Sequence, residues 1–593
     1  MDPAVISEMD ELEDGIAFRA SRNHAHHTWA QTFHSSPELY IRPQSVEEIQ
    51  KAITLARRCR RRIATVGCGH SPSDLTCTSS WQINLDDFNK LLSVDKSTGI
   101  VVMQAGIRLY QLSAELDKVG LAMPNLGSIN QQSIAGAIST GTHGSALRHG
   151  ALSSSILSLR IALSDSRVVT CSPSENLDLF RAALLSLGAL GIITEITFQA
   201  VPAFNLHWQQ KIYPDTHIFE TWSEDLWKQT EFVRVWWFPY TRRATVWAAE
   251  KTDRSPKEMQ YREGFYDGPA GYYIYHNLLA LAQYVPRILP WVEWFVFGLQ
   301  YGFGSAEKTN IEAIQPGPQA LLMNCLYSQY VNEWAIPLHL GPIALRRLSS
   351  WLNHLTPDDP DYVEHGIPYS ADGLWVHAPV EVRVSDNTAK NKFRADVRAY
   401  LDNTCTEGPT LYLNATLYRP YNMDPPCRAR YYQGFEYLMR DLGGKPHWAK
   451  NFDVSGEDME EMFGKNLLEY RRVRADADPD GMFVGPWHRR YALGEREPRF
   501  DLEEVEIGRE KMKQGGVKVL GQLMAPVRKR GSIEKTQDKQ QKIALKTKVS
   551  GSSDGESVDQ LSIRTGSESS FDMLQEGEGV ESQILMPQFR PNS

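Results

Sequence analysis

The feature that most constrains the fold is a glycine loop that directly follows a short apolar strand. Residues 63–66 are apolar and β-prone, which predicts a buried strand. Gly67 and Gly69 lack a Cβ, so the backbone there can take positive φ angles and approach a ligand closely. Successive N–H groups in such a loop can form a concavity for an anion such as a diphosphate. The same residues also fit a tight turn between two buried elements.

The spacing of the loop differs from two common phosphate-binding motifs. It lacks the Lys-Ser/Thr end of a P-loop and the G-x-G-x-x-G spacing of a Rossmann turn. His70 comes directly after the loop, within reach of the rest of any ligand that the loop holds. Imidazole is a nucleophile that can bond covalently to a cofactor. A hydrogen-bonded turn histidine is the simpler alternative for His70.

Residues 67–74, with the sequence Gly-Cys-Gly-His-Ser-Pro-Ser-Asp, resemble the flavin loop of the aldonolactone oxidases, a family of the vanillyl-alcohol-oxidase superfamily. In that family the histidine carries FAD through the 8α carbon of the flavin, so the resemblance implies that His70 is the covalent attachment point. Cys68 stands where the family often has Gly or Ser, and this leaves the binding backbone of the loop intact. The cofactor-binding residues implied for the loop are Val66, Gly67, Cys68, Gly69, His70 and Ser71.

Two later segments are similar to further FAD contacts of the same family. Residues 132–145 are nearly all small, which predicts either a packing seam between helices or a surface whose N–H and hydroxyl groups approach a large flat ligand. They match the family's S-I-A-G-x-x-x-T-G-T-H-G segment, and residues 187–195 match its contact near the adenine. The resemblance implies a PCMH-type FAD-binding domain over residues 36–203. Its further cofactor-binding residues are Ser128, Ser133, Gly136, Ser139, Thr140, His143, Gly144, Gly191 and Ile193.

A charged pair stands in an otherwise apolar stretch of the second half of the chain. Side chains alternate along a strand, so over residues 376–384 Glu381 and Arg383 share one face and the neighbouring valines share the other. Burying such a pair is costly unless it is paired or faces a cavity, which predicts either a buried salt bridge or a substrate-binding face. The pattern resembles the family's Glu-x-Arg substrate pair, and residues 447–450 match its H-W-A-K motif. The resemblance implies that Glu381, Arg383 and Lys450 are the catalytic residues.

The rest of the chain indicates the overall architecture. Aromatic-rich alternating stretches at residues 232–238 and 243–247 predict strands of a sheet that covers the flavin. We expect an α+β protein in which a PCMH-type FAD-binding domain of two subdomains precedes an α+β cap and catalytic domain with a large antiparallel sheet, over residues 204–499. Residues 500–593 contain few aromatics and are expected to form a charged helix and a disordered tail, because they cannot bury enough apolar area to offset the entropy of ordering.

Residues 272–303 are unusually apolar, but Pro286, Pro290, Arg287 and Glu293 interrupt them. This pattern does not favour a membrane-spanning helix. It predicts either a helical hairpin in the core of the cap or an interfacial element that places aromatic side chains in a membrane surface. Relatives in the family associate with organelle membranes, which supports the second interpretation.

Composition excludes several classes of function. The net charge is −9 without a basic stripe, so no nucleic-acid partner is expected. Seven cysteines without a C-x-x-C pair argue against a disulfide framework and a structural zinc site, so we predict no metal and a reducing compartment. Residues 1–15 are acidic and lack an apolar core, so neither a secretory signal nor a transit peptide is expected.

The resemblance implies a particular reaction: FAD-dependent oxidation of D-arabinono-1,4-lactone or a related aldono-1,4-lactone by O2, which gives H2O2 and the precursor of D-erythroascorbate. The expected partners are therefore a sugar lactone and O2, and the expected location is intracellular, with association with the mitochondrial outer membrane. Two alternatives remain. One is a dehydrogenase on the same scaffold with another electron acceptor, and the other is a membrane or scaffold protein that retains FAD without turnover. The oligomeric state is not indicated.

Overall fold

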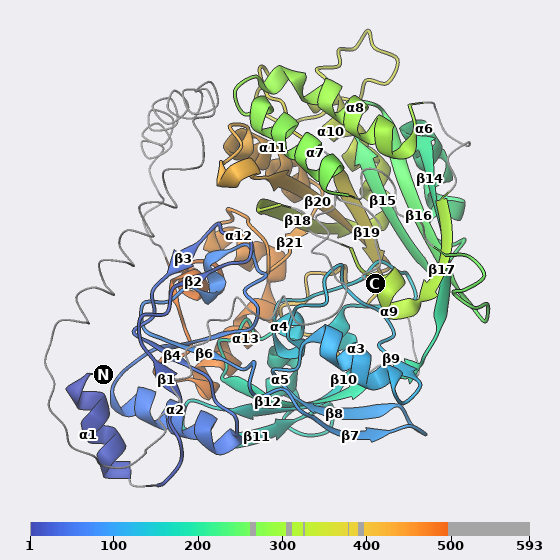
Figure 1. The fold of residues 1–593 in the computed structure, drawn as a ribbon. Coiled ribbons are helices and arrows are strands. Elements are labelled where there is room, and N and C mark those ends of the chain that lie inside the picture. Colours follow the sequence, from blue (N-terminus) through green and yellow to red (C-terminus); the bar gives the residue numbers. More distant parts are fainter. Residues whose placement is uncertain are drawn as a thin grey trace, which may run out of the picture. The chain divides into compact units, whose positions relative to one another are not determined.

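The computed structural model describes residues 2–495 apart from residue 13 and residues 261–267, 304–310, 324–326, 378 and 389–396. The tail expected over residues 500–593 therefore lies outside the described residues. The N-terminal part contains a four-stranded and a five-stranded sheet, and the later part contains an eight-stranded sheet. Figure 1 shows how helices are mixed with these sheets. This is the α+β architecture that the sequence predicts, with a large sheet in the second half.

The four-stranded sheet has the order β1-β4-β6-β5, in which β4, β6 and β5 run parallel. Helix α2 connects β4 to β5, and Ser45 caps it by accepting the N–H of Glu48 at 3.2 Å. The carboxylate of Glu48 accepts the N–H of Gln44 and binds Arg19. The elements of this region are α1 (Pro3–Leu12), β1 (Ala20–Ser21), β2 (His26–His27), β3 (His34–Ser35), β4 (Leu39–Ile41), α2 (Val46–Arg58), β5 (Ile63–Val66) and β6 (Trp81–Asn84).

The five-stranded sheet is antiparallel, with the order β11-β10-β12-β8-β7. The small-residue segment at residues 132–145 contains the short helix α4, which Ser133 caps by accepting the N–H of Gly136. The elements are β7 (Leu91–Asp95), β8 (Ile100–Gln104), α3 (Leu109–Asp117), β9 (Leu121–Ala122), α4 (Ile134–Ser139), β10 (Ile156–Ala162), β11 (Val168–Cys171), α5 (Leu177–Ala183), β12 (Ile192–Gln199) and β13 (Val201–Pro202).

The eight-stranded sheet is antiparallel and has the order β17-β14-β16-β15-β19-β20-β18-β21. The strand predicted at residues 376–384 begins only at Val380. Pro379 precedes it, and proline has no N–H to donate to a sheet. The strands are β14 (Asn205–Pro214), β15 (Phe232–Phe238), β16 (Arg243–Thr252), β17 (Ile311–Pro316), β18 (Gln329–Pro337), β19 (Val380–Ser385), β20 (Thr410–Tyr418) and β21 (Lys445–Pro446).

Helices pack against the eight-stranded sheet, among them α11 against β18 and α7 against β20. On β18, Asn332 donates to Glu436 of α11, so α11 lies on the face opposite to that of the neighbouring residue Glu333. Residues 272–303 contain a helical hairpin, α7 and α8, which is the first of the two alternatives that the sequence leaves open, and Tyr275 of α7 packs against Tyr418 of β20. The helices of this part are α6 (Asp215–Thr221), α7 (Pro269–Ala282), α8 (Leu289–Tyr301), α9 (Gly317–Ala320), α10 (Gly341–Leu352) and α11 (Arg428–Asp441).

The last helices return the chain to the N-terminal sheets. Tyr470 donates its hydroxyl to the carbonyl of Ser186 at 2.7 Å, and the N–H of Ile63 in β5 donates to the carbonyl of Met482 at 2.9 Å. These contacts place residues near 480 beside the glycine loop. The helices are α12 (Gly456–Phe463), α13 (Lys465–Ala477) and α14 (Pro486–Tyr491).

Candidate active site

A first cavity lies in the N-terminal part of the chain, over the glycine loop. Its walls come from the loop after β5, from α4 and from the turn before β12, and residues 483–488 close one side. The structure brings together here most of the cofactor-binding residues predicted from the sequence. These are Val66, Gly67, Cys68, Gly69, His70, Ser71, Ser133, Gly136, Ser139, Thr140, Gly191 and Ile193.

A second cavity adjoins the first and lies between the N-terminal part and the eight-stranded sheet. His70, Ser71 and Gln132 line both cavities, so the two meet at the histidine. The predicted residues Ser128, His143, Glu381, Arg383 and Lys450 all line the second cavity. Gly144 lines neither of them, but it borders a third cavity together with Gly127.

The glycine loop packs tightly against α4 and ends in a histidine, one ring nitrogen of which is free of partners in the described part of the chain. A Cβ added at Gly67 would meet Ser133 Oγ at 2.5 Å, so this position is confined to glycine by its surroundings. His70 stacks on Trp29 with 5.0 Å between ring centroids, and within the described residues its buried Nδ1 has no hydrogen-bond partner. Burial, with smaller effects of Arg108 and Lys450, lowers the pKa of His70 to about 3. The imidazole is therefore neutral near pH 7 and keeps a lone pair for bonding.

The charged face of the second cavity follows from the register of the large sheet. Residues directly opposite each other in antiparallel strands share a face. Glu381 of β19 pairs with Trp236 of β15 on one side and with Asn414 of β20 on the other, and Asn414 pairs in turn with Glu333 of β18. Asn414 donates to Glu381 Oε2 at 3.3 Å. One row of polar and aromatic side chains thus crosses four strands below the cavity.

Arg383 is held within this face by two carboxylates. Its Nη2 lies 2.6 Å from Glu333 Oε1, and its Nε lies 3.6 Å from Glu381 Oε1. Its Nη1 lies 3.5 Å from Ser128 Oγ on the opposite wall. Arg383 therefore belongs both to a buried salt bridge and to the cavity wall. The sequence predicts either a buried salt bridge or a face towards a cavity, and the structure has both.

Glu333 is fully buried and also lies 3.5 Å from Lys450 Nζ, measured from its Oε2. Burial alone would raise the pKa of Glu333, but the charges of Arg383 and Lys450 outweigh this effect and hold the pKa well below its usual range. For Arg383, burial would lower the pKa, but Glu333 and Glu381 raise it. Glu333 and Arg383 are therefore both ionised throughout the physiological pH range.

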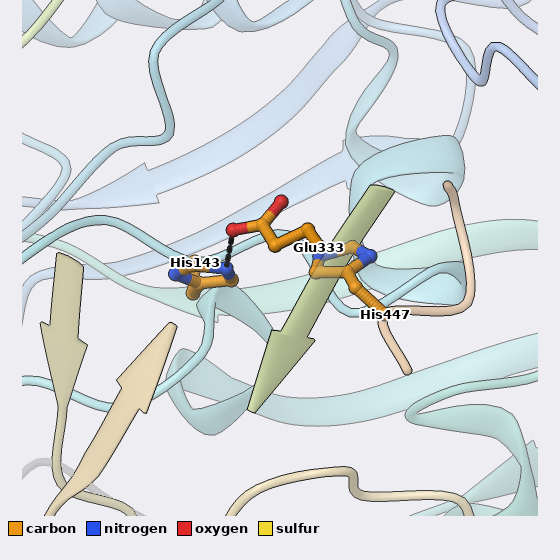
Figure 2. A group of neighbouring side chains, drawn as sticks. All are labelled: His143, Glu333 and His447. Carbon is orange, nitrogen blue, oxygen red and sulfur yellow. Dashed lines mark ion pairs between the residues drawn. The ribbon is translucent and has the colours of Figure 1, made fainter. Parts of the chain in front are cut away.

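Among the described residues, His143, Glu333 and His447 form a group with the composition of a metal site (Figure 2). His143 Nε2 lies 3.2 Å from Glu333 Oε1, and its ring stacks on Tyr412 at 3.5 Å between centroids. The side chains of Arg383 and Lys450 already contact the carboxylate of Glu333. A divalent cation there would face both of them, so the charges favour an ion-pair network over a metal site.

Several residues of these cavities were not predicted. Glu333 could have been noticed as a charged residue inside the apolar stretch at residues 329–337, but its partners depend on pairing between strands that lie far apart in the sequence. His488 and residues 483–485 line the first cavity only because the C-terminal helices return to it. The sequence contains no local signal for that return. The first two residues of the H-W-A-K motif are buried, since His447 is 3% and Trp448 1% exposed.

The fold and the two joined cavities define a flavoprotein with a PCMH-type FAD-binding part and a sheet-based cap. The family described as "FAD binding domain" matches residues 37–172, and the family described as "D-arabinono-1,4-lactone oxidase" matches residues 196–491. The chain belongs to the D-arabinono-1,4-lactone oxidase family.

Similar proteins support this assignment. A provisionally named D-arabinono-1,4-lactone oxidase of Neurospora crassa is 58% identical, with 88% of this chain and 98% of the relative covered. The D-arabinono-1,4-lactone oxidase of Yarrowia lipolytica is 39% identical, with 78% and 96% covered. Among solved structures, cholesterol oxidase of Brevibacterium sterolicum has a TM-score of 0.66 at 16% identity, with 81% of this chain and 98% of that chain covered, which shows the shared fold.

The buried His488 gives a pH-dependent stability that can be measured. Its Nδ1 accepts the N–H of Gly485 at 3.0 Å and its Nε2–H donates to the carbonyl of Leu187 at 2.8 Å, so the contact with Gly485 requires the neutral ring. Burial lowers its pKa to about 4, below the ordinary value of 6.5. As pH falls from 6.5 towards 4, the unfolded chain binds a proton that the folded chain does not, so stability decreases. The expected slope for this group is about 1.4 kcal/mol per pH unit.

Denaturant unfolding of the FAD-loaded protein at several pH values between 7 and 4 would measure this slope. We expect His488→Gln to reduce the loss of stability in acid, whereas replacement of the exposed His339 by Gln should leave it unchanged. Equal slopes in the wild-type protein and His488→Gln would contradict the assignment of the neutral ring.

Proposed function

We propose that this protein is an FAD-dependent aldono-1,4-lactone oxidase that acts on D-arabinono-1,4-lactone or a close relative, with O2 as the electron acceptor. The main observation behind this proposal is that Glu381, Arg383 and Lys450 line one cavity, and that this cavity meets the glycine-loop cavity at His70. The relatives named for D-arabinono-1,4-lactone, and an L-gulonolactone oxidase of Scyliorhinus torazame that is 34% identical, support the substrate class. The product would be H2O2 together with the precursor of D-erythroascorbate.

The roles of the residues follow from their charges and positions. The chemistry supplied by bound FAD is acceptance of a hydride from the alcohol carbon and delivery of two electrons to O2. Glu381 would orient the substrate hydroxyl and accept its proton. Arg383 and Lys450 would place positive charge beside polar oxygens of the substrate and beside negative charge that develops during the reaction. Trp236 and the walls of the cavity would limit access of water.

The glycine loop and His70 carry the cofactor part of the proposal. The residues predicted to bind FAD surround the first cavity, and the neutral, stacked imidazole stands where the two cavities meet. A covalent 8α-histidyl bond through His70 is consistent with a ring nitrogen that has no other partner among the described residues.

Replacement of Glu381 by Gln tests the reaction. Because the amide keeps the shape but cannot accept the proton, turnover should fall by about 10²–10⁴. Arg383→Ala should lower kcat by about 10²–10³ through loss of a pre-placed donor. Oxygen-electrode traces with D-arabinono-1,4-lactone measure both effects, and Glu312→Gln, on the edge strand β17 of the same sheet, is the matched control.

Two other experimental results would contradict the proposed lactone oxidase. If the wild-type protein consumed no oxygen but reduced added cytochrome c when given the lactone, it would be a dehydrogenase. If Glu381→Gln and Arg383→Ala retained every activity of the wild-type protein, the charged face would have no part in turnover.

The covalent bond has a direct test in the unfolded protein. The protein is denatured in acid, separated on a gel and viewed under ultraviolet light. We expect a fluorescent flavin band in the wild-type protein and in Cys68→Ser, and no band in His70→Ala. A wild-type pigment that separates completely from the polypeptide would refute the tether while leaving non-covalent FAD binding intact.

We further propose that the α7–α8 hairpin binds a lipid surface, such as the outer face of the mitochondrial outer membrane. Its outer side exposes apolar side chains while its inner side packs on the core, and its charged residues are the exposed Arg287 and the buried Glu293. None of the helices in the described part of the chain has the length and apolar character to cross a bilayer. Peripheral insertion of aromatic rings is the mode that such a surface fits. The exposed residues are Tyr273, Leu281, Tyr284, Val285, Trp291, Trp294, Leu299 and Phe303.

Flotation with phosphatidylcholine vesicles that contain phosphatidylinositol tests the hairpin. The double variant Trp291→Ser, Trp294→Ser should bind at least tenfold more weakly, because each ring contributes roughly 1–2 kcal/mol on burial. The control is Tyr110→Ser, Leu468→Ser, which removes exposed apolar residues elsewhere. Equal binding by the double variant and the control would contradict a role of the hairpin.

A further inference from the structure

One buried carboxylate stands behind the wall of the second cavity and contacts several of the residues that form this wall. Glu333 has no exposed surface and does not itself line the cavity. Its Oε1 lies 2.6 Å from Arg383 Nη2 and 3.2 Å from His143 Nε2, and its Oε2 lies 3.5 Å from Lys450 Nζ. Arg383, His143 and Lys450 all reach the cavity surface.

We propose that Glu333 is a positioning residue that holds Arg383 and Lys450 in place against the substrate, an inference that rests on the proposed lactone oxidation. The two cations come from different parts of the chain, since Arg383 lies on β19 and Lys450 lies in the loop after β21. Each would repel the other without a negative charge between them. The carboxylate of Glu333 supplies that charge and uses one oxygen for each cation.

Glu381 does not replace this contact. It meets Arg383 only at Nε, at 3.6 Å, while its other oxygen accepts from Asn414. Glu381 also lines the cavity and is placed to bind the substrate, whereas Glu333 has no access to it. The two carboxylates thus have different roles: Glu381 faces the substrate, and Glu333 holds Arg383 and Lys450 in positions that also face the substrate. His143 also lies beside this carboxylate, but its Nδ1 donates to the carbonyl of Gly144 and burial lowers the pKa of the ring, so its neutral Nε2 makes no hydrogen bond to Glu333.

The backbone reinforces the same arrangement. The N–H of His447 donates to the carbonyl of Glu333 at 2.9 Å, and the N–H of Lys450 donates to the carbonyl of His447 at 2.9 Å. The loop that carries Lys450 is therefore tied to β18 at the residue whose side chain binds the ammonium group. A misplacement of about 1 Å in such a group can cost roughly 10² in rate.

The same strand provides a matched control. Asn332, the neighbour of Glu333, binds Glu436 on the opposite face of the sheet, and Glu436 is also nearly fully buried. Burial raises the pKa of Glu436 to about 8, so this group is largely protonated at pH 7, and Gln is a close substitute for it. Glu436→Gln removes a buried carboxyl group from the same sheet without touching the cations.

The first experiment compares Glu333→Gln with Glu436→Gln in lactone oxidation. We expect kcat/KM of Glu333→Gln to fall by about 10² while its flavin content stays normal, and Glu436→Gln to stay within about threefold of the wild-type protein. In an Arg383→Ala background, Glu333→Gln should have a smaller effect, because one of the two cations through which it acts is gone. Independent effects of the two substitutions would overturn the proposal.

The second experiment does not depend on turnover. Glu333→Ala leaves a space between Arg383, Lys450 and His143 in which formate can replace the missing carboxylate. Sodium formate should raise the unfolding temperature of Glu333→Ala, relative to sodium chloride, and should leave the wild-type protein and Glu436→Ala unchanged. Formate should also restore part of the lost kcat/KM.

The outcomes separate this inference from the proposed function. If the wild-type protein oxidises no lactone but formate stabilises Glu333→Ala, the proposed function fails and the placement of the cations stands. If the wild-type protein is active and formate has no effect on Glu333→Ala, or if Glu333→Gln matches Glu436→Gln, Glu333 has no positioning role. Failure of both Glu333 variants to fold, with or without formate, would assign the residue to folding and also overturn the proposal.

Discussion

The structure depends on the neutralisation of charges that are buried between the cap sheet and the FAD-binding part. An isolated ion is costly to move out of water, and a buried pair is tolerated only when geometry and further hydrogen bonds compensate. Here Arg383 and Lys450 are compensated by Glu333, and Arg383 also meets Glu381 and Ser128. Ser128 belongs to the N-terminal part and Glu333 to the cap. The charge network therefore joins the two parts of the chain at the place where the cofactor and the substrate would meet.

The cofactor cavity is not built from one continuous segment of the chain. The glycine loop, α4 and the turn before β12 come from the first 200 residues, but residues 483–488 close the same cavity. Ile63 in β5 is hydrogen-bonded to Met482, and Ser186 to Tyr470, so the end of the described chain is fixed to the loop that it covers. The predicted FAD-binding domain ends at residue 203. The cavity that would hold the dinucleotide, however, is formed by residues before this boundary together with residues 483–488.

Local patterns allowed much of this architecture to be predicted. The strand at residues 63–66 and the strand at residues 232–238 have the predicted bounds, because apolar or aromatic residues of β propensity define them without tertiary information. The start of β19 was predicted too early, because Pro379 prevents pairing. Glu333 was missed although it contacts two of the three predicted catalytic residues. Its role arises from strand register between β18, β20 and β19, which a single sequence does not reveal.

The α7–α8 hairpin and the second cavity are physically connected. Tyr418 lines the cavity, and its ring packs against Tyr275 of α7 at 6.2 Å and against Tyr327 at 5.1 Å. His377, another cavity residue, stacks on Tyr418 at 5.2 Å. The exposed aromatic side of the hairpin thus lies one layer of tyrosines away from the site of the proposed reaction. Attachment of this hairpin to a lipid surface, as proposed above, would hold the cavity close to the membrane.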